Sequence, residues 1–138
     1  MGLQLAIIKD DDMTEYVVQA AQEAGFVSEN IHIAKNQQEA FALIQQMVPD
    51  IAVVNQHLTD DGRLDDGIEV IRTLHDRHRR CIIICLTSCG TPALGQQAQR
   101  AGARDYVDAS LPYVNWYELL REKLVLWQGV VMGRHTRS

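Results

Sequence analysis

Short apolar runs alternate along this chain with longer segments in which apolar residues recur every three or four positions. A short, unbroken apolar run is typical of a strand that is covered on both faces of a sheet. The pattern predicts five strands, over residues 5–8, 31–34, 51–54, 81–86 and 106–107.

The segments between these runs have the spacing of amphipathic helices. Asn36 and Asn115 are predicted N-caps, and Glu39 and Glu118 are placed to complete capping boxes. Pro92 suits the first turn of a helix. Helices are therefore predicted over residues 13–24, 36–47, 67–74, 92–101 and 115–127, with a polar loop over 55–66.

Strands and helices in this order predict an α/β fold with a doubly wound, five-stranded parallel sheet and helices on both faces. The predicted domain covers residues 1–128, and residues 129–138 are expected to be a frayed tail, a linker or a cloning remnant. In such sheets the functional site lies beyond the carboxyl ends of the strands. That rule gathers residues 9–12, 55–57, 87–89 and 108–110 at one edge.

Composition narrows the classes of partner. The chain has 138 residues and a net charge of −5, which argues against direct binding of nucleic acid. It has neither a long apolar run nor a signal-peptide pattern, so a cytoplasmic protein without membrane association is expected. Cys81, Cys85 and Cys89 are interpreted as reduced, buried thiols rather than metal ligands, because the run between them has the character of a strand.

Five segments in this order and spacing resemble the receiver domain of bacterial response regulators over about residues 3–127. These segments are IIKDDD (7–12), PDIAVVN (49–55), DGIEVIRTL (66–74), IICLTS (83–88) and AGARDYV (101–107). The resemblance implies a (βα)5 flavodoxin-like receiver fold and a place in two-component, phosphorelay-type signalling.

In the family, two acidic residues and an acceptor aspartate bind Mg2+, and the aspartate attacks a phosphoryl group. The acidic pair maps onto Asp10 and Asp11, or onto Lys9 and Asp10 if the register slips by one. The acceptor maps onto Asn55, whose carboxamide is not a useful nucleophile. The resemblance thus implies weak Mg2+ binding at most, and no other cofactor.

Three further family positions follow the later strands. The hydroxyl that binds the phosphoryl group maps onto Thr87, and the switch aromatic maps onto Tyr106. The family lysine maps onto Ala109, so its ammonium group is missing. Asn55 and Ala109 independently remove parts of the same chemistry, and together they predict a degenerate pseudo-receiver that is not phosphorylated.

Such a domain is expected to be no enzyme and to act by binding a signalling protein, either a histidine kinase or an output protein. Self-association through the face formed by helix four, strand five and helix five is a further expectation. The alternative is a regulatory domain that senses a small ligand or ion in the crevice at the strand ends, with Asp10, Asp11, Asn55 and Thr87.

Other residues have two interpretations each. Thr87 is either a helix cap or part of an anion site, and Tyr106 is either a switch or a buried anchor. Trp127 is expected to pack in the core, with docking of a partner as the alternative. His57 is expected to have no chemical role. The acidic loop residues are interpreted as a solvated turn rather than a substitute acceptor, namely Asp60, Asp61, Asp65 and Asp66.

Overall fold

The computed structural model describes residues 2–9, 13–58, 66–87, 92–111 and 114–136. The strands are β1 (Leu5–Ile8), β2 (Ile31–Ala34), β3 (Ile51–Asn55), β4 (Ile82–Thr87) and β5 (Asp105–Asp108). The helices are α1 (Thr14–Glu23), α2 (Gln37–Gln46), α3 (Asp66–Arg77), α4 (Pro92–Ala101) and α5 (Trp116–Thr136), with a 3-10 turn at Ser28–Asn30.

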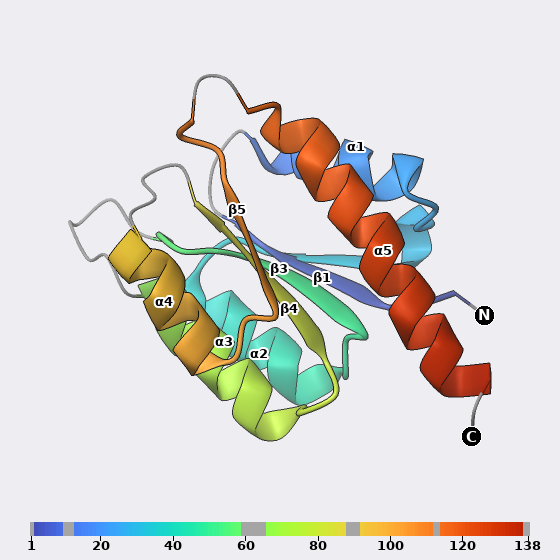
Figure 1. Cartoon of the computed structure of the whole chain (residues 1–138). Helices are drawn as coiled ribbons and strands as arrows, with labels where there is room; N and C mark the ends of the chain where they lie inside the picture. The colour runs from blue at the N-terminus through green and yellow to red at the C-terminus, as the bar shows by residue number, and fades with distance from the viewer. Residues whose placement is uncertain (1, 10–12, 59–65, 88–91, 112–113, 137–138) are drawn as a thin grey trace.

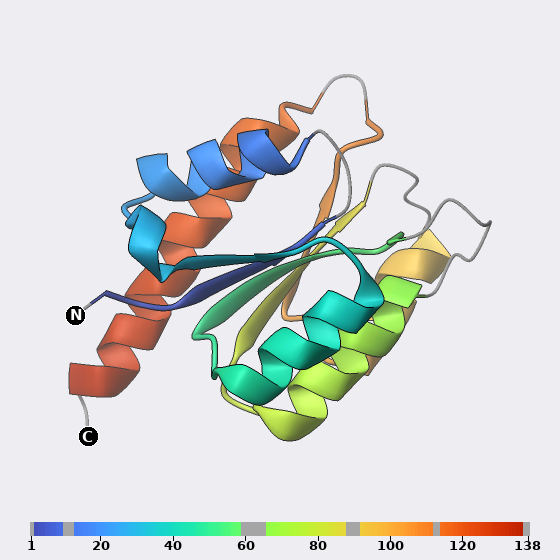
Figure 2. The ribbon, with the colours of Figure 1, turned by 180° about the vertical axis from the view of Figure 1, so that it is seen from behind.

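The strands form one parallel sheet in the order β2-β1-β3-β4-β5. Helices α1 and α5 cover one face, and α2, α3 and α4 cover the other (Figures 1 and 2). This arrangement confirms the predicted doubly wound α/β fold. Strands β1 and β2 have the predicted bounds, and the ends of β3, β4 and β5 differ from the predicted ones by at most one residue.

The two faces of the sheet explain why the strands are apolar throughout. Leu5 and Ile7 of β1 pack into the cluster with α1 and α5. Ala6 and Ile8 of the same strand pack into the cluster on the opposite face. Because successive strand residues point to opposite faces, both sets must be apolar when both faces are covered.

The predicted helix caps are present. The side chain of Asn36 accepts a hydrogen bond from the backbone N–H of Glu39 at 2.8 Å, and Asn115 accepts one from Glu118 at 3.2 Å. The return bond at α2 differs from a standard capping box, because the Glu39 carboxylate accepts from the backbone N–H of Lys35, one residue before the cap.

The end of α5 corrects the sequence prediction. Residues 129–136 were expected to be frayed, but the helix continues to Thr136. Val131 is buried, and the Arg134 guanidinium donates to the backbone carbonyl of Arg80 at 2.9 Å. These contacts hold the last turns of α5 against the body of the domain.

Cys81 and Cys85 are buried, free thiols, as predicted, whereas Cys89 lies outside the described residues. Burial, reinforced by Asp50 for Cys81, raises the pKa of both thiols to about 12. Within the described ranges, no helix has the length and apolar character needed to cross a membrane.

Candidate functional site at the carboxyl edge of the sheet

The sheet register brings four of the predicted site positions to one edge. Ile8 of β1 pairs with Val54 of β3, so the residues that follow them, Lys9 and Asn55, occupy corresponding positions at the strand ends. On the other side of Asn55, β4 ends at Thr87, and Ala109 directly follows β5. Asp10 and Asp11 lie outside the described residues.

Asn55 is held by a bond that an aspartate does not make. Its side chain is buried, and its Nδ2 donates to the backbone carbonyl of His57 at 2.6 Å. A carboxylate has acceptor oxygens only, so an aspartate here turns an acceptor toward that carbonyl. The amide therefore fits this turn better than the acid does, and His57 contributes its backbone carbonyl rather than its ring.

The backbone of the next helix lies directly against this turn. The N–H of Gly67 donates to the carbonyl of Gln56 at 3.0 Å. A Cβ added to Gly67 would lie 2.2 Å from the carbonyl oxygen of Asn55 and 2.5 Å from that of Gln56. Only glycine allows α3 to begin this close to the end of β3.

Asp66 has a structural role in the same turn. It is fully buried, and its Oδ1 accepts from the backbone N–H groups of Leu58 at 2.9 Å and Gly67 at 3.0 Å. The interpretation of this residue as part of a solvated acidic turn is therefore wrong. A carboxylate without exposed surface is also inaccessible to a phosphodonor. Asp60, Asp61 and Asp65 lie outside the described residues.

The described donors fit a divalent metal poorly. Asn55 supplies one neutral amide oxygen, and its Nδ2 engages the His57 carbonyl. The corresponding position on β1 is Lys9, which is 5% exposed, and a lysine ammonium repels a divalent cation. Mg2+ prefers several oxygen ligands with negative charge.

Thr87 and Tyr106 lie on adjacent strands beside this edge. Thr87 is fully buried at the end of β4, and its strand partner is Asp108. Burial, followed by the nearby Cys85 and Asp108, raises the pKa of Tyr106 to about 12, while the neighbouring Thr87 side chain acts in the opposite direction. The Tyr106 hydroxyl is buried.

Ala109 lies at the carboxyl edge directly after β5, at the position of the family lysine. Its backbone N–H donates to the carbonyl of Thr87 at 2.7 Å. The methyl group packs beside the apolar cluster under α1 and α5. The following residue, Ser110, donates from its backbone N–H and its hydroxyl to Asp108. Residues 108–110 thus form a tight polar turn without a cation.

Sequence reasoning missed Gln56 as a component of the site. This side chain is fully buried, and its Nε2 donates to the carbonyl of Leu94 in α4 at 3.4 Å. It follows an apolar strand in a stretch of polar residues, so the sequence contains no sign of its burial. The structural role of Asp66 has a weak signal, since an aspartate directly before Gly67 is placed to cap a turn.

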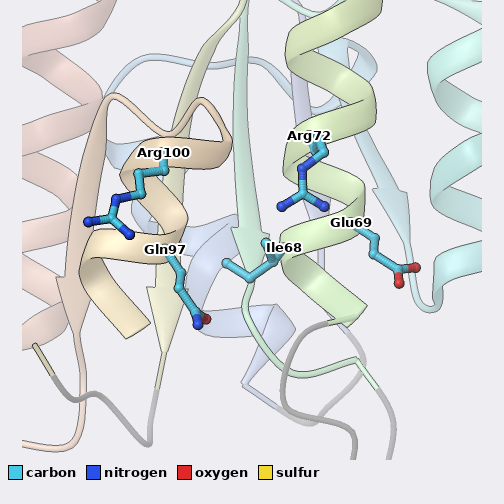
Figure 3. A pocket seen from close by; sticks show the side chains of 5 residues that line it. All are labelled: Ile68, Glu69, Arg72, Gln97 and Arg100. Carbon is cyan, nitrogen blue, oxygen red and sulfur yellow. The ribbon is translucent and has the colours of Figure 1, made fainter. Parts of the chain in front are cut away.

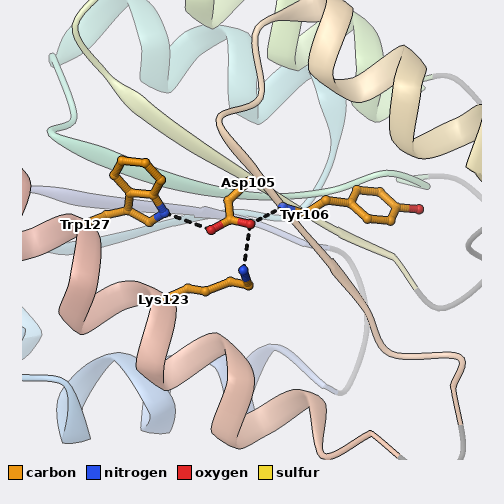
Figure 4. A network of polar contacts seen from close by, with 4 residues as sticks. All are labelled: Asp105, Tyr106, Lys123 and Trp127. Carbon is orange, nitrogen blue, oxygen red and sulfur yellow. Dashed lines mark hydrogen bonds and ion pairs between the residues drawn. The ribbon is translucent and has the colours of Figure 1, made fainter.

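A second polar cluster joins β5 to α5 (Figure 4). Lys123 Nζ lies 2.7 Å from Asp105 Oδ1, and Trp127 Nε1 donates to Asp105 Oδ2 at 2.9 Å. The guanidinium of Arg104 lies 5.8 Å from the centre of the Trp127 ring. We call Asp105, Lys123 and Trp127 the β5–α5 corner. Trp127 is thus a packing residue, as expected first from the sequence.

The pKa of Asp105 reflects this arrangement. Partial burial alone would raise it, but the hydrogen bonds from Lys123, Trp127 and the Tyr106 backbone, together with the Lys123 charge, lower it below the usual value. The Asp105 side chain is 19% exposed, so solvent screens the pair only in part.

This fold, with its polar edge at the strand ends, defines a class of signalling domain. Residues 5–112 match the model of the response regulator receiver domain, and the chain therefore belongs to that family. Solved structures of two response regulator proteins illustrate the shared fold. One is a two-component response regulator from Clostridium difficile, with a TM-score of 0.74, 22% identity and coverage of 91% of this chain and 94% of that one.

The other is a CheY-like receiver domain protein from Methanospirillum hungatei, with a TM-score of 0.70, 23% identity and coverage of 93% and 98%. The chain is also 32% identical, over 104 residues, to the photosynthetic apparatus regulatory protein RegA of Cereibacter sphaeroides. The match covers 75% of this chain and 53% of that protein, so the chain spans about half the length of this relative.

Proposed function

We propose that this receiver domain regulates its partner without aspartyl phosphorylation. The observation that carries the proposal is the 2.6 Å hydrogen bond from Asn55 Nδ2 to the His57 carbonyl. An acyl phosphate forms when a carboxylate oxygen attacks phosphorus, and the amide lacks this nucleophile. The donor group of the amide is also used to hold the turn, so the substitution is built into the local structure.

Two neighbouring positions support the same conclusion. Ala109 supplies a methyl group where an ammonium would pair with a phosphoryl oxygen. Lys9, buried at the strand end beside Asn55, disfavours a divalent cation. Phosphoryl transfer in this family requires a nucleophile, a metal ion and a positively charged partner. At this edge Asn55, Lys9 and Ala109 each oppose one of these three requirements.

Receiver domains of response regulators interact with kinases and output domains. For this chain we propose a protein-binding role rather than an enzymatic one, with self-association through α4, β5 and α5 as one form of it. The β5–α5 corner supports this proposal, because Lys123 and Trp127 bond α5 to Asp105 and so join two elements of that face.

The test is the intact mass of the 138-residue chain after incubation with acetyl phosphate and Mg2+. Two variants are run beside it, the double variant Asn55→Asp with Ala109→Lys and the triple variant that adds Lys9→Asp. We expect no adduct on the unmodified chain and an adduct of one phosphoryl group on at least one variant. Circular dichroism verifies that each variant is folded.

The outcomes separate the two registers of the acidic pair. An adduct on the double variant assigns the pair to Asp10 and Asp11, whereas an adduct on the triple variant alone assigns it to positions 9 and 10. An adduct on the unmodified chain would overturn the proposal. Folded variants without an adduct would show that these positions do not explain the missing chemistry.

A further inference from the structure

Helices α3 and α4 flank a polar pocket that is open to solvent, on the opposite face of the sheet from α5. Its volume is about 250 Å3, and its lining residues are Ile68, Glu69 and Arg72 of α3 with Gln97 and Arg100 of α4 (Figure 3). Toward their ends the two helices approach closely, since a Cβ added to Gly102 would lie 2.5 Å from the His75 side chain.

The charged side chains that line the pocket differ in whether they have a hydrogen-bond or ion-pair partner. Within the described part of the chain, Arg72 and Arg100 have no side-chain hydrogen bond or ion pair. Glu69 accepts a hydrogen bond from Gln37 of α2 at 2.7 Å. Figure 3 shows Glu69 on the other side of α3 from Gln97 and Arg100. The pocket therefore has two guanidinium groups and an amide, and its carboxylate is engaged elsewhere.

We propose that this pocket binds an oxyanion of the phosphate class, either free or as a phosphate ester. A guanidinium presents paired N–H donors in the geometry of two phosphate oxygens, and the Gln97 amide adds a neutral donor. The chain carries a net charge of −5, and two arginines from neighbouring helices, with no partner among the described residues, line this one pocket.

The size and lining of the pocket limit the ligand. A volume of about 250 Å3 lies below the range of about 300–1,000 Å3 that is typical of pockets for drug-sized molecules. Buried Ile68 gives an apolar floor, and no lining residue among those that the structure describes is aromatic. A compact, charged group is therefore expected, and a stacked nucleobase is not.

This site shares no residue with the carboxyl edge at Asn55. Anion binding in this pocket is independent of the proposed regulation without phosphorylation, so either proposal stands if the other fails. Ligand binding would link α3 to α4 across the pocket, and so bias the position of α4. Gly95 of α4 lies against the Tyr106 ring, which connects this helix to β5.

The experiment is an NMR titration of backbone amides of the whole chain with inorganic phosphate, at ionic strength held constant with sodium chloride. We expect saturable shifts in α3 and α4. Arg72→Gln and Arg100→Gln are each expected to weaken binding about tenfold, the effect of one charge-assisted contact. Arg79→Gln is the matched control, because it removes the same charge from an exposed position outside the pocket.

A second titration uses a short glutamate peptide, which tests an acidic protein segment as the occupant. Binding of this peptide with dependence on Arg72 and Arg100, in the absence of phosphate binding, would overturn the proposal. Equal affinities of the Arg72, Arg100 and Arg79 variants for phosphate would also overturn it, because general attraction to positive charge would then explain the shifts. The amide spectrum of each variant verifies its fold.

Discussion

The carboxyl edge of the sheet and the β5–α5 corner are both polar, but they are built differently. At the edge, the polar side chains of Asn55 and Asp66 bond to backbone groups of the same turn. At the corner, Asp105 bonds to Lys123 and Trp127 on an element 18 and 22 residues away. The edge thus shapes a local turn, and the corner fastens two distant elements together.

This difference indicates how a receiver fold can persist when residues at its carboxyl edge change. The sheet is held by buried apolar residues on both faces, and the Asn55 side chain belongs to neither cluster. The edge can therefore exchange a carboxylate for an amide without loss of the core. The corner holds the face formed by β5 and α5 through contacts that are independent of the edge.

The largest expected effect comes from crowding the edge. Gly67→Ala puts a methyl group 2.2 Å from the carbonyl oxygen of Asn55, so the start of α3 must move away from β3. We expect a loss of about 3 kcal/mol in the free energy of unfolding, the upper part of the range for overpacking. Urea denaturation followed by circular dichroism measures it.

Gly129→Ala is the control for Gly67→Ala. An added Cβ at Gly129 meets nothing within 4 Å, and alanine has a higher helix propensity than glycine. We expect this variant to gain stability, by up to about 1 kcal/mol. If both alanine variants behaved alike, steric contact at the edge would not be what restricts position 67.

The sequence predicted the sheet well because both faces are covered. Strand residues such as Ile51, Val53 and Ile83 must then be apolar, and that requirement leaves unbroken runs in the sequence. The capping residues Asn36 and Asn115 were also predictable, because a cap depends on residues three positions apart. Local rules are sufficient where the structure depends on local contacts.

The sequence prediction was wrong where contacts between distant parts of the chain determine the structure. Gly129 and Gly133 lower the helix propensity of the last segment, yet buried Val131 and the Arg134–Arg80 contact keep it helical.

The positions of Lys9, Asn55, Thr87 and Ala109 at one edge were predictable from the order of the strands. The burial of Gln56 and Asp66 was not, because it depends on the path of the chain after β3.

A smaller effect is expected from restoring the acid. Asn55→Asp removes the Nδ2 donor and places a carboxylate oxygen near the His57 carbonyl, which also accepts hydrogen bonds. In EDTA we expect a loss of about 2 kcal/mol, typical of a buried polar group left without its partner. Added Mg2+ should return part of this stability, and denaturation with and without the metal measures both effects.

Asn55→Ala separates the loss of the Nδ2 donor from the gain of a negative charge, because it removes the donor without adding a charge. We expect it to be more stable in EDTA than Asn55→Asp and unaffected by Mg2+. An aspartate variant as stable in EDTA as the unmodified chain would contradict the proposed role of the amide in the turn.

The β5–α5 corner is expected to contribute less. Lys123→Met removes a partly buried partner of Asp105, whose side chain is 19% exposed, and should cost about 1 kcal/mol. Arg121→Met is the matched control, because Arg121 and Glu23 lie 3.7 Å apart with side chains 37% and 40% exposed. We expect almost no change there, measured by thermal and urea denaturation. Equal losses in both variants would mean that burial does not strengthen the Lys123 pair.

The smallest expected effect is the pH dependence of the corner. The pKa of Asp105 is lowered in the folded chain, despite the opposing effect of burial, by its hydrogen bonds from Lys123 and Trp127. The ionised form is thus favoured by folding. Its contribution to stability is present above the unfolded pKa of about 3.9 and is lost as the pH falls through the folded value.

Carbon-detected NMR of the Asp105 carboxyl group measures this titration directly. In Lys123→Met the midpoint should move to higher pH, because the positive charge and one hydrogen bond are gone, and the acid-induced loss of stability should become smaller. An unchanged midpoint in that variant would show that Lys123 does not stabilise the carboxylate, and the corner would then be held mainly by Trp127 and its packing.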